Sequence, residues 1–202
     1  MTEITGITGI TRIGREENMS VIVRRMREED IPQAVEIEKA AFTRPWSKSI
    51  FKATLLLPYA AYYVAVEQKT LEQKTLKQKA LEQEALEQEA LEQKTLEQGE
   101  KPGLDQDRIV GICGVKKIFE EGEISNVAVH PDYRGRGVSR RMLEMLIREA
   151  REGGVESFTL EVRAGNRPAI RLYESFGFRT EGIRPRFYDH PVEDGLIMWL
   201  RR

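Results

Sequence analysis

The chain has 202 residues, 40% of them hydrophobic and 32% charged, which suits one globular domain plus additional sequence. Its formal net charge of -1 offers no general basic field for nucleic acid, and no apolar stretch is long enough to span a membrane. The single Cys113 cannot form an internal disulfide, so we expect a buried small side chain there. Two scattered histidines and one cysteine do not make a metal site. We expect a cytoplasmic, monomeric protein that binds neither nucleic acid nor membrane.

The first 18 residues repeat Ile-Thr-Gly and lack the basic and apolar regions of a signal peptide, so we expect a flexible extension. The domain is expected over residues 19–202. It opens with a strand over Val21–Arg25 and a helix over Glu28–Ala41, for which Asp30 is the expected N-cap and Pro32 lies in the first turn. Part of the apolar face of this helix is formed by Ile31, Val35, Ile37 and Glu38.

Residues 67–100 are a low-complexity insertion that follows a helix capped by Ser47 and a strand over Tyr59–Val66. Leucine recurs there every fifth residue, at Leu71, Leu76, Leu81, Leu86, Leu91 and Leu96. A step of five turns a helix by about 140°, so these leucines form no stripe for a coiled coil. The insertion is either a docking arm or a tolerated loop expansion. We favour the expansion, because long surface insertions cost little free energy.

The remaining sequence alternates strands with helices. The expected strands are Arg108–Lys116, Gly122–His130, Ser157–Arg163, Phe178–Phe187 and Glu193–Leu200, and the expected helices are Val138–Glu152 and Asn166–Phe176. This order fits an α/β domain whose mixed sheet is covered by helices on both faces. The insertion would then lie in a connection between two neighbouring strands.

An anion site is indicated by Asn126-Val-Ala-Val-His-Pro-Asp-Tyr-Arg-Gly-Arg-Gly-Val-Ser-Arg-Arg141, which reads as a buried strand, a glycine-rich basic turn and a helix start. Free backbone N–H groups at the helix N-terminus, the helix dipole and nearby arginines together favour a phosphate or pyrophosphate. The turn has neither the Gly-Lys-Ser/Thr of a Walker loop nor the three glycines of a dinucleotide fingerprint. The alternative is an ordinary glycine-rich turn with solvated arginines.

The spacing Arg134-x-x-Gly137-x-Ser139 resembles the Arg/Gln-x-x-Gly-x-Gly/Ala signature of the GNAT superfamily of N-acetyltransferases, with Ser139 in place of the usual Gly or Ala. In that family the loop holds the pyrophosphate of acetyl-CoA. The family fold is a mixed, mostly antiparallel sheet whose central parallel pair splays around acetyl-CoA, with helices on both faces. The resemblance implies acetyl-CoA as co-substrate, no metal, and the cofactor-binding residues Val127, Ala128, Val129, Arg134, Gly135, Arg136, Gly137, Val138, Ser139, Arg140, Asn166 and Tyr173.

A polar strand face points to a wet cleft. In Ser157–Arg163 the apolar residues alternate with Thr159, Glu161 and Arg163, and a central strand does not bury such groups without purpose. The segment Asn166–Phe178, with Leu-Tyr-Glu-Ser-Phe-Gly-Phe at its end, resembles the second acetyl-CoA-binding motif of the same family.

Three further segments, Pro45-Trp-Ser47, Leu160-Glu-Val-Arg163 and Arg184-Pro-Arg-Phe-Tyr188, resemble the RimI-like acetyltransferases that modify the N-terminal alanine of a ribosomal protein. This resemblance implies that Glu161 is the base and that Tyr173 protonates the leaving thiolate. It places the protein substrate near Trp46, Glu161 and Tyr188. The oxyanion is expected to bind backbone N–H groups of the strand Asn126–Val129.

Plainer interpretations stay open. Glu161 could be a solvated strand residue, and Tyr173 a core aromatic residue with its hydroxyl at the edge. The same fold could acetylate a small amine or a lysine side chain. The chain could also be a non-catalytic CoA-binding regulatory module with the insertion as its interaction surface.

Overall fold

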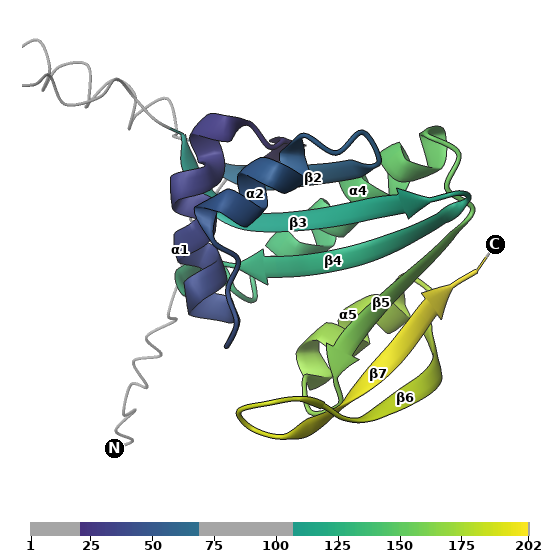
Figure 1. The fold of residues 1–202 in the computed structure, drawn as a ribbon. Helices are drawn as coiled ribbons and strands as arrows, with labels where there is room; N and C mark the ends of the chain where they lie inside the picture. Colours follow the sequence, from purple (N-terminus) through teal and green to yellow (C-terminus); the bar gives the residue numbers. More distant parts are fainter. Residues whose placement is uncertain (1–20, 69–106, 202) are drawn as a thin grey trace, which may run out of the picture.

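The computed structural model describes residues 21–68 and 107–201, so the expected N-terminal extension and nearly all of the insertion lie outside the described residues. These residues form a seven-stranded sheet in the order β1-β2-β3-β4-β5-β7-β6 (Figure 1). The strands are β1 (Val21–Arg25), β2 (Ala60–Glu67), β3 (Arg108–Ile118), β4 (Glu121–Val129), β5 (Ser157–Arg163), β6 (Arg179–Tyr188) and β7 (Glu193–Leu200). The α-helices are α1 (Ile31–Ala41), α2 (Lys48–Leu55), α4 (Val138–Glu152) and α5 (Arg167–Ser175).

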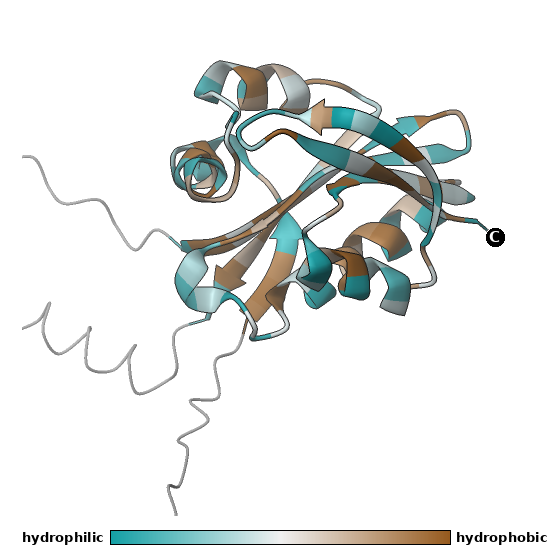
Figure 2. Ribbon diagram, turned by 90° about the horizontal axis from the view of Figure 1, so that it is seen from below, coloured by the Kyte–Doolittle hydropathy of each residue, from teal (hydrophilic) through white to brown (hydrophobic). Residues whose placement is uncertain are grey.

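Helices cover both faces of the sheet, as expected (Figures 1 and 2). α4 and α5 pack on one face, where Met142, Leu143 and Leu146 of α4 are buried at helical spacing. α1 and α2 pack on the other face through Ile31, Ala34, Val35, Ile37 and Phe51. Figure 2 shows apolar residues along the strands between these layers. Cys113 of β3 is buried in this core, which confirms its expected role.

All pairings in the sheet are antiparallel except that of β4 with β5, so the expected mixed sheet with one central parallel pair is confirmed. β2 and β3 are neighbours, with Glu67 opposite Arg108. The insertion therefore connects two adjacent antiparallel strands, as expected.

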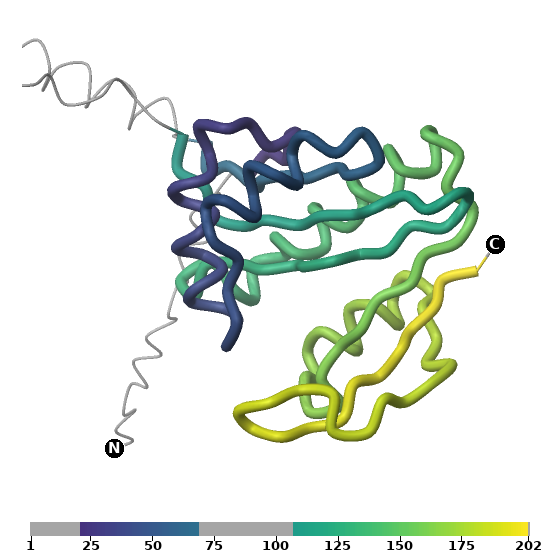
Figure 3. The backbone as a smooth tube through the Cα atoms, viewed as in Figure 1, coloured from purple at the N-terminus to yellow at the C-terminus, as the bar shows by residue number. Residues whose placement is uncertain are grey.

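β4 and β5 form a pair only near their starts. Their register runs from Glu121 opposite Ser157 to Ile124 opposite Leu160 and ends there. Just past this point the register of β4 with β3 shifts by one residue. Ile124 faces Val115 and Asn126 faces the adjacent Gly114, so Ser125 between them is a β-bulge. Beyond the bulge the two strands diverge, as the tube in Figure 3 shows. Among the described strands, none pairs with the facing backbone edges of β4 and β5 beyond this point.

One predicted helix start was wrong. The segment expected as a single helix over Glu28–Ala41 begins with a 3-10 turn, Glu28–Asp30, and α1 starts only at Ile31. Asp30 makes no side-chain cap for α1. Its carboxylate instead accepts hydrogen bonds from the Arg24 guanidinium at 2.7 Å and the Arg27 backbone N–H at 2.8 Å. These two donors compensate the buried negative charge of Asp30.

Within the described residues, no helix is long and apolar enough to cross a membrane. The same part of the chain contains no group of three His, Cys, Asp or Glu side chains arranged to hold a metal ion.

Candidate active site

A cleft opens where β4 and β5 diverge. It consists of two connected cavities of about 760 and 560 Å³ that share walls formed by Trp46, Asn126, Glu161 and Tyr188. The larger one extends over β7 and also reaches Glu38. The other passes to the first turns of α5, where it reaches Asn166 and Tyr173. The predicted pair Glu161 and Tyr173 and the predicted substrate residues Trp46 and Tyr188 therefore line one space.

Glu161 projects into the cleft from the polar face of β5. Its neighbours Leu160 and Val162 are buried, while its own side chain keeps 30% of its surface exposed. The carboxylate Oε1 forms an ion pair with Nε of Arg184 on β6 at 3.0 Å. Glu161 is thus a partly hydrated carboxylate that one guanidinium orients.

Tyr173 reaches the cleft from α5. The residue is 8% exposed, and its ring packs against Phe178 with the centroids 5.8 Å apart. Burial, followed by the nearby Tyr188, raises the pKa of its phenol above the usual value. The phenol therefore keeps its proton well into the alkaline range, and its hydroxyl makes no hydrogen bond to any described residue. Its proton is therefore not engaged by any acceptor in the described part of the chain.

Trp46 and Tyr188 stand on opposite walls. Trp46 belongs to the loop between α1 and α2 and packs on Phe51 and Tyr62, with centroids 5.5 and 5.6 Å away. Tyr188 ends β6 beneath the Arg163 guanidinium, which lies 4.4 Å from its ring centroid. Burial and the Glu161 charge raise the pKa of Tyr188, against the opposing effect of Arg163.

The two loops that carry these walls also touch. Arg44 of the α1–α2 loop forms an ion pair with Asp189 of the β6–β7 loop. A ligand in the cleft would therefore lie between two connected loops.

The glycine-rich turn has the backbone geometry expected for an anion site. Gly135 and Gly137 adopt φ values of 75° and 77°, in the left-handed region that favours glycine, and a Cβ on either would meet nothing within 4 Å. Gly137 is the N-cap of α4, so the first backbone N–H groups of that helix have no partner within the helix. Open space in front of free donors suits the approach of a phosphate.

The arginines of the turn are held by the protein. Arg134 donates to the carbonyl oxygens of Val129 at 3.2 Å and Ala40 at 3.4 Å, and Arg140 donates to Ser175 Oγ at 2.8 Å. Arg136 lies over the ring of Tyr133 with its Cζ 5.4 Å from the centroid. No residue of this turn lines the two cavities, which both contact β4 at Ile124, Ser125 and Asn126 and extend along it no further than Val127. In these positions the arginine side chains stabilise the turn, and they do not face the cleft.

The other predicted cofactor residues fall into two groups. Asn166 both lines the cleft and caps α5, since its Oδ1 accepts from the Ala169 N–H at 3.3 Å. Ala128, Val129 and Val138 have buried side chains. They can offer only backbone groups to a ligand.

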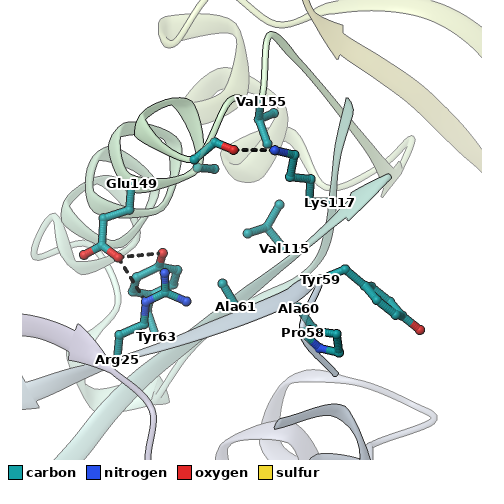
Figure 4. Close-up of a pocket in the computed structure, with 12 residues that line it drawn as sticks. Arg25, Pro58, Tyr59, Ala60, Ala61, Tyr63, Val115, Lys117, Glu149 and Val155 are labelled. Carbon is teal, nitrogen blue, oxygen red and sulfur yellow. Dashed lines mark hydrogen bonds and ion pairs between the residues drawn. The ribbon is translucent and has the colours of Figure 1, made fainter. Parts of the chain in front are cut away.

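A separate cavity of about 340 Å³ lies between the C-terminal part of α4 and strands β2 and β3 (Figure 4). Its charged groups are paired within the protein: Arg25 Nε and the Tyr63 hydroxyl both donate to Glu149, each at 3.0 Å, and Lys117 donates to the Gly153 carbonyl. No predicted site residue lines this cavity.

Sequence reasoning assigned no role to the side chains of three residues that line the cleft: Glu38, Asn126 and Arg184. A signal existed for Glu38. It lies seven positions after Ile31 on the apolar face of α1, where a carboxylate is out of place. Asn126 and Arg184 carry no such signal, because their importance comes from the β4 bulge and from the pairing of distant strands.

Comparisons with known proteins agree with this architecture. The model of the Acetyltransferase (GNAT) family matches residues 70–178. A candidate [ribosomal protein bS18]-alanine N-acetyltransferase of Bacillus subtilis (strain 168) is 32% identical over 179 residues, which cover 88% of this chain and 93% of that protein. A [ribosomal protein bS18]-alanine N-acetyltransferase of Salmonella typhimurium is 42% identical over 96 residues, which cover 46% of this chain and 65% of that protein.

A solved structure gives the same result. The crystal structure of the ribosomal-protein-S18-alanine N-acetyltransferase from Escherichia coli matches with a TM-score of 0.65 and 27% identity, covering 90% of this chain and 93% of that one. The resemblance seen in the motifs is confirmed, and so is acetyl transfer as the class of reaction. The chain belongs to the acetyltransferase (GNAT) family.

Proposed function

We propose that this chain transfers the acetyl group of acetyl-CoA to the α-amine of a protein N-terminus, and that its substrate is a ribosomal protein with N-terminal alanine. The observation that carries the proposal is the meeting of Glu161 from β5 and Tyr173 from α5 in one cavity beside the open edge of β4. The names of the Bacillus, Salmonella and Escherichia relatives support the choice of substrate.

The residues present fit acetyl-CoA. The turn before α4 offers open space at Gly135 and Gly137, and the first backbone N–H groups of α4 have no partner within the helix, which suits a pyrophosphate. The unpaired edges of β4 and β5 offer main-chain groups to an extended chain of amides. When bound, acetyl-CoA supplies a thioester whose carbonyl carbon accepts the amine. We place its reactive end between Val127 and Tyr173.

Two protons must move in this reaction. A protonated α-amine, with an ordinary pKa near 7.7–8.0, must lose one before it can attack. Glu161 is the proposed acceptor, directly or through water, and a carboxylate is a sufficient base for an amine of this pKa. Tyr173, whose raised pKa keeps its phenol protonated, is the proposed donor to the leaving thiolate. Backbone N–H groups of β4 would stabilise the oxyanion.

The substrate side of the cleft suits a peptide terminus. The walls carry aromatic rings from Trp46, Phe187 and Tyr188, which can pack on the first side chains of a peptide. An α-amine also needs less help to lose its proton than a lysine ε-amine, whose ordinary pKa is about 10.4.

The test compares two peptides of one sequence that begin with alanine and contain an internal lysine, one with a free and one with a blocked N-terminus. We expect acetyl-CoA to be consumed only with the free peptide, and fragment masses to place the acetyl group on the terminal nitrogen. Equal acetylation of both peptides would show that the lysine side chain is the acceptor. Acetylation of small amines but of neither peptide would also refute the proposal.

A further inference from the structure

Glu38 is a buried carboxylate without a cationic partner in the described part of the chain. It is 1% exposed and lies on the apolar face of α1, near Ala34 and Val35. Burial raises its pKa, although hydrogen bonds from Asn126 and from the Trp46 backbone oppose this effect. A charge buried in this way is costly, and an apolar side chain at the same position is often equally or more stable. The presence of Glu38 therefore needs a reason other than stability.

The carboxylate joins the two walls of the cleft. Its Oε1 accepts a hydrogen bond from Asn126 Nδ2 at 2.6 Å, and its Oε2 accepts one from the Trp46 backbone N–H at 3.2 Å. Asn126 belongs to β4, and Trp46 to the loop after α1. Glu38 thus fixes the orientation of the Asn126 amide and the position of the aromatic wall at the same time.

Asn126 has an acceptor that the protein does not use. The residue is 8% exposed, follows the Ser125 bulge directly and lines both cavities of the cleft. Its Oδ1 is buried, and none of the described residues donates a hydrogen bond to it. A buried amide oxygen normally has a donor, so the missing donor should come from a bound molecule. Because Glu38 holds Nδ2, Oδ1 is the amide atom that lacks a partner among the described residues.

We propose that Asn126 binds the N–H group of the incoming amine through Oδ1, and that Glu38 is a positioning residue that fixes the Asn126 amide for this contact. The inference rests on the proposed function only in taking the donor to be the amine of the acetyl acceptor. Acetyl-CoA also carries amide N–H donors. We assign the contact to the amine because Asn126 lines the larger cavity too, which contains Glu161 and Trp46 but not Tyr173 or Asn166.

The first variant removes the acceptor. A hydrogen bond to a charged or reacting group corresponds to a change of about 10- to 100-fold. For Asn126→Ala we therefore expect kcat/KM for the peptide to fall about 10- to 100-fold, while the dissociation constant of acetyl-CoA, measured by calorimetry, changes less than about 3-fold. Unchanged cofactor binding also shows that the variant is folded.

Two variants at Glu38 form a matched pair. Glu38→Gln keeps an oxygen that can accept from Asn126 Nδ2, so peptide kcat/KM should stay within about 3-fold of the parent chain. Glu38→Leu removes that acceptor, so the loss should be about 10-fold or more, with a thermal midpoint equal to or above that of the parent. A purely structural role would lower the thermal midpoint instead.

The double variant Glu38→Leu/Asn126→Ala decides whether Glu38 acts through Asn126. If it does, the double variant is no worse than Asn126→Ala alone. Additive losses, peptide kinetics of Asn126→Ala equal to those of the parent, or a loss confined to acetyl-CoA affinity would each overturn the inference. A parent chain that acetylates only lysine or small amines refutes the proposed function, and the same kinetics, measured with that acceptor, still test Asn126.

Discussion

Replacing Tyr173 by Phe removes a single oxygen from the cleft, which makes it a selective test of the proton donor. The ring keeps its packing against Phe178, and the lost hydroxyl has no hydrogen bond to a described residue. The free energy of unfolding should therefore change by less than about 1 kcal/mol, or about 2–4 °C in the thermal midpoint for a chain of this size.

The effect on catalysis should be much larger. General acid catalysis contributes about 10²- to 10⁴-fold, which equals about 3–5 kcal/mol of barrier at 1.36 kcal/mol per factor of ten. We expect kcat for peptide acetylation to fall by at least about 10²-fold, while acetyl-CoA affinity stays near that of the parent chain. Release of free CoA, followed with a thiol reagent, gives kcat, and calorimetry gives the affinity.

The matched control is Tyr63→Phe, the same change at a buried tyrosine that does not line the cleft. Its hydroxyl donates to Glu149, so this variant should lose some stability but keep its turnover. The pH profile adds a second check. Because burial raises the Tyr173 pKa, its phenol stays protonated past pH 10, the ordinary tyrosine value, and should cause no alkaline fall in kcat below that pH. Near-normal turnover of Tyr173→Phe would refute the assignment.

Three further predictions concern the base, the anion turn and the insertion. Glu161→Gln should lose most activity at low pH, where the unassisted amine is largely protonated; a loss independent of pH would indicate a binding or structural role. Gly137→Ala should weaken acetyl-CoA binding measured by calorimetry and cost about 1–2 kcal/mol of stability, because its φ is 77°. Gly154→Ala at the other end of α4, with φ 84°, should cost similar stability but leave that binding unchanged, and equal binding by both variants would contradict the role of the turn. Replacing residues 69–106 by a short Gly-Ser turn should leave folding and peptide acetylation nearly unchanged, because β2 and β3 are adjacent at the junction; a folded but inactive product would show that the insertion recruits substrate.

The local pattern of the sequence was enough to predict most of the elements. The strands Val21–Arg25, Ser157–Arg163 and Glu193–Leu200 and the helix Val138–Glu152 have the predicted bounds. Apolar residues recur in them at strand or helix spacing, and the helix is bounded by Gly137 and Gly153. The predicted start of α1 was wrong because the Asp30 carboxylate pairs with Arg24 instead of capping the helix. Arg24 lies on a strand, and helix-capping rules consider only residues of the helix itself.

The site was only partly predictable. Motifs identified Glu161, Tyr173 and Asn166, which the fold brings to one cavity. The arginines of the turn were expected to point at a pyrophosphate, but Arg134 is held by the carbonyl groups of Val129 and Ala40. Such contacts join segments far apart in the chain, and periodicity does not reveal them. The same holds for the pairing of Glu38 with Asn126, 88 positions away.

The most direct test of the central claim is a crystal structure of the chain with acetyl-CoA. We predict that the pyrophosphate lies at the turn over Arg134–Arg140, that the pantetheine amides pair with the open edges of β4 and β5, and that the sulfur lies within hydrogen-bonding reach of the Tyr173 hydroxyl. The acetyl carbon should then face the side of the cleft that holds Glu161 and Asn126. A cofactor bound elsewhere, such as in the cavity between α4 and strands β2 and β3, or a sulfur remote from Tyr173, would contradict the account.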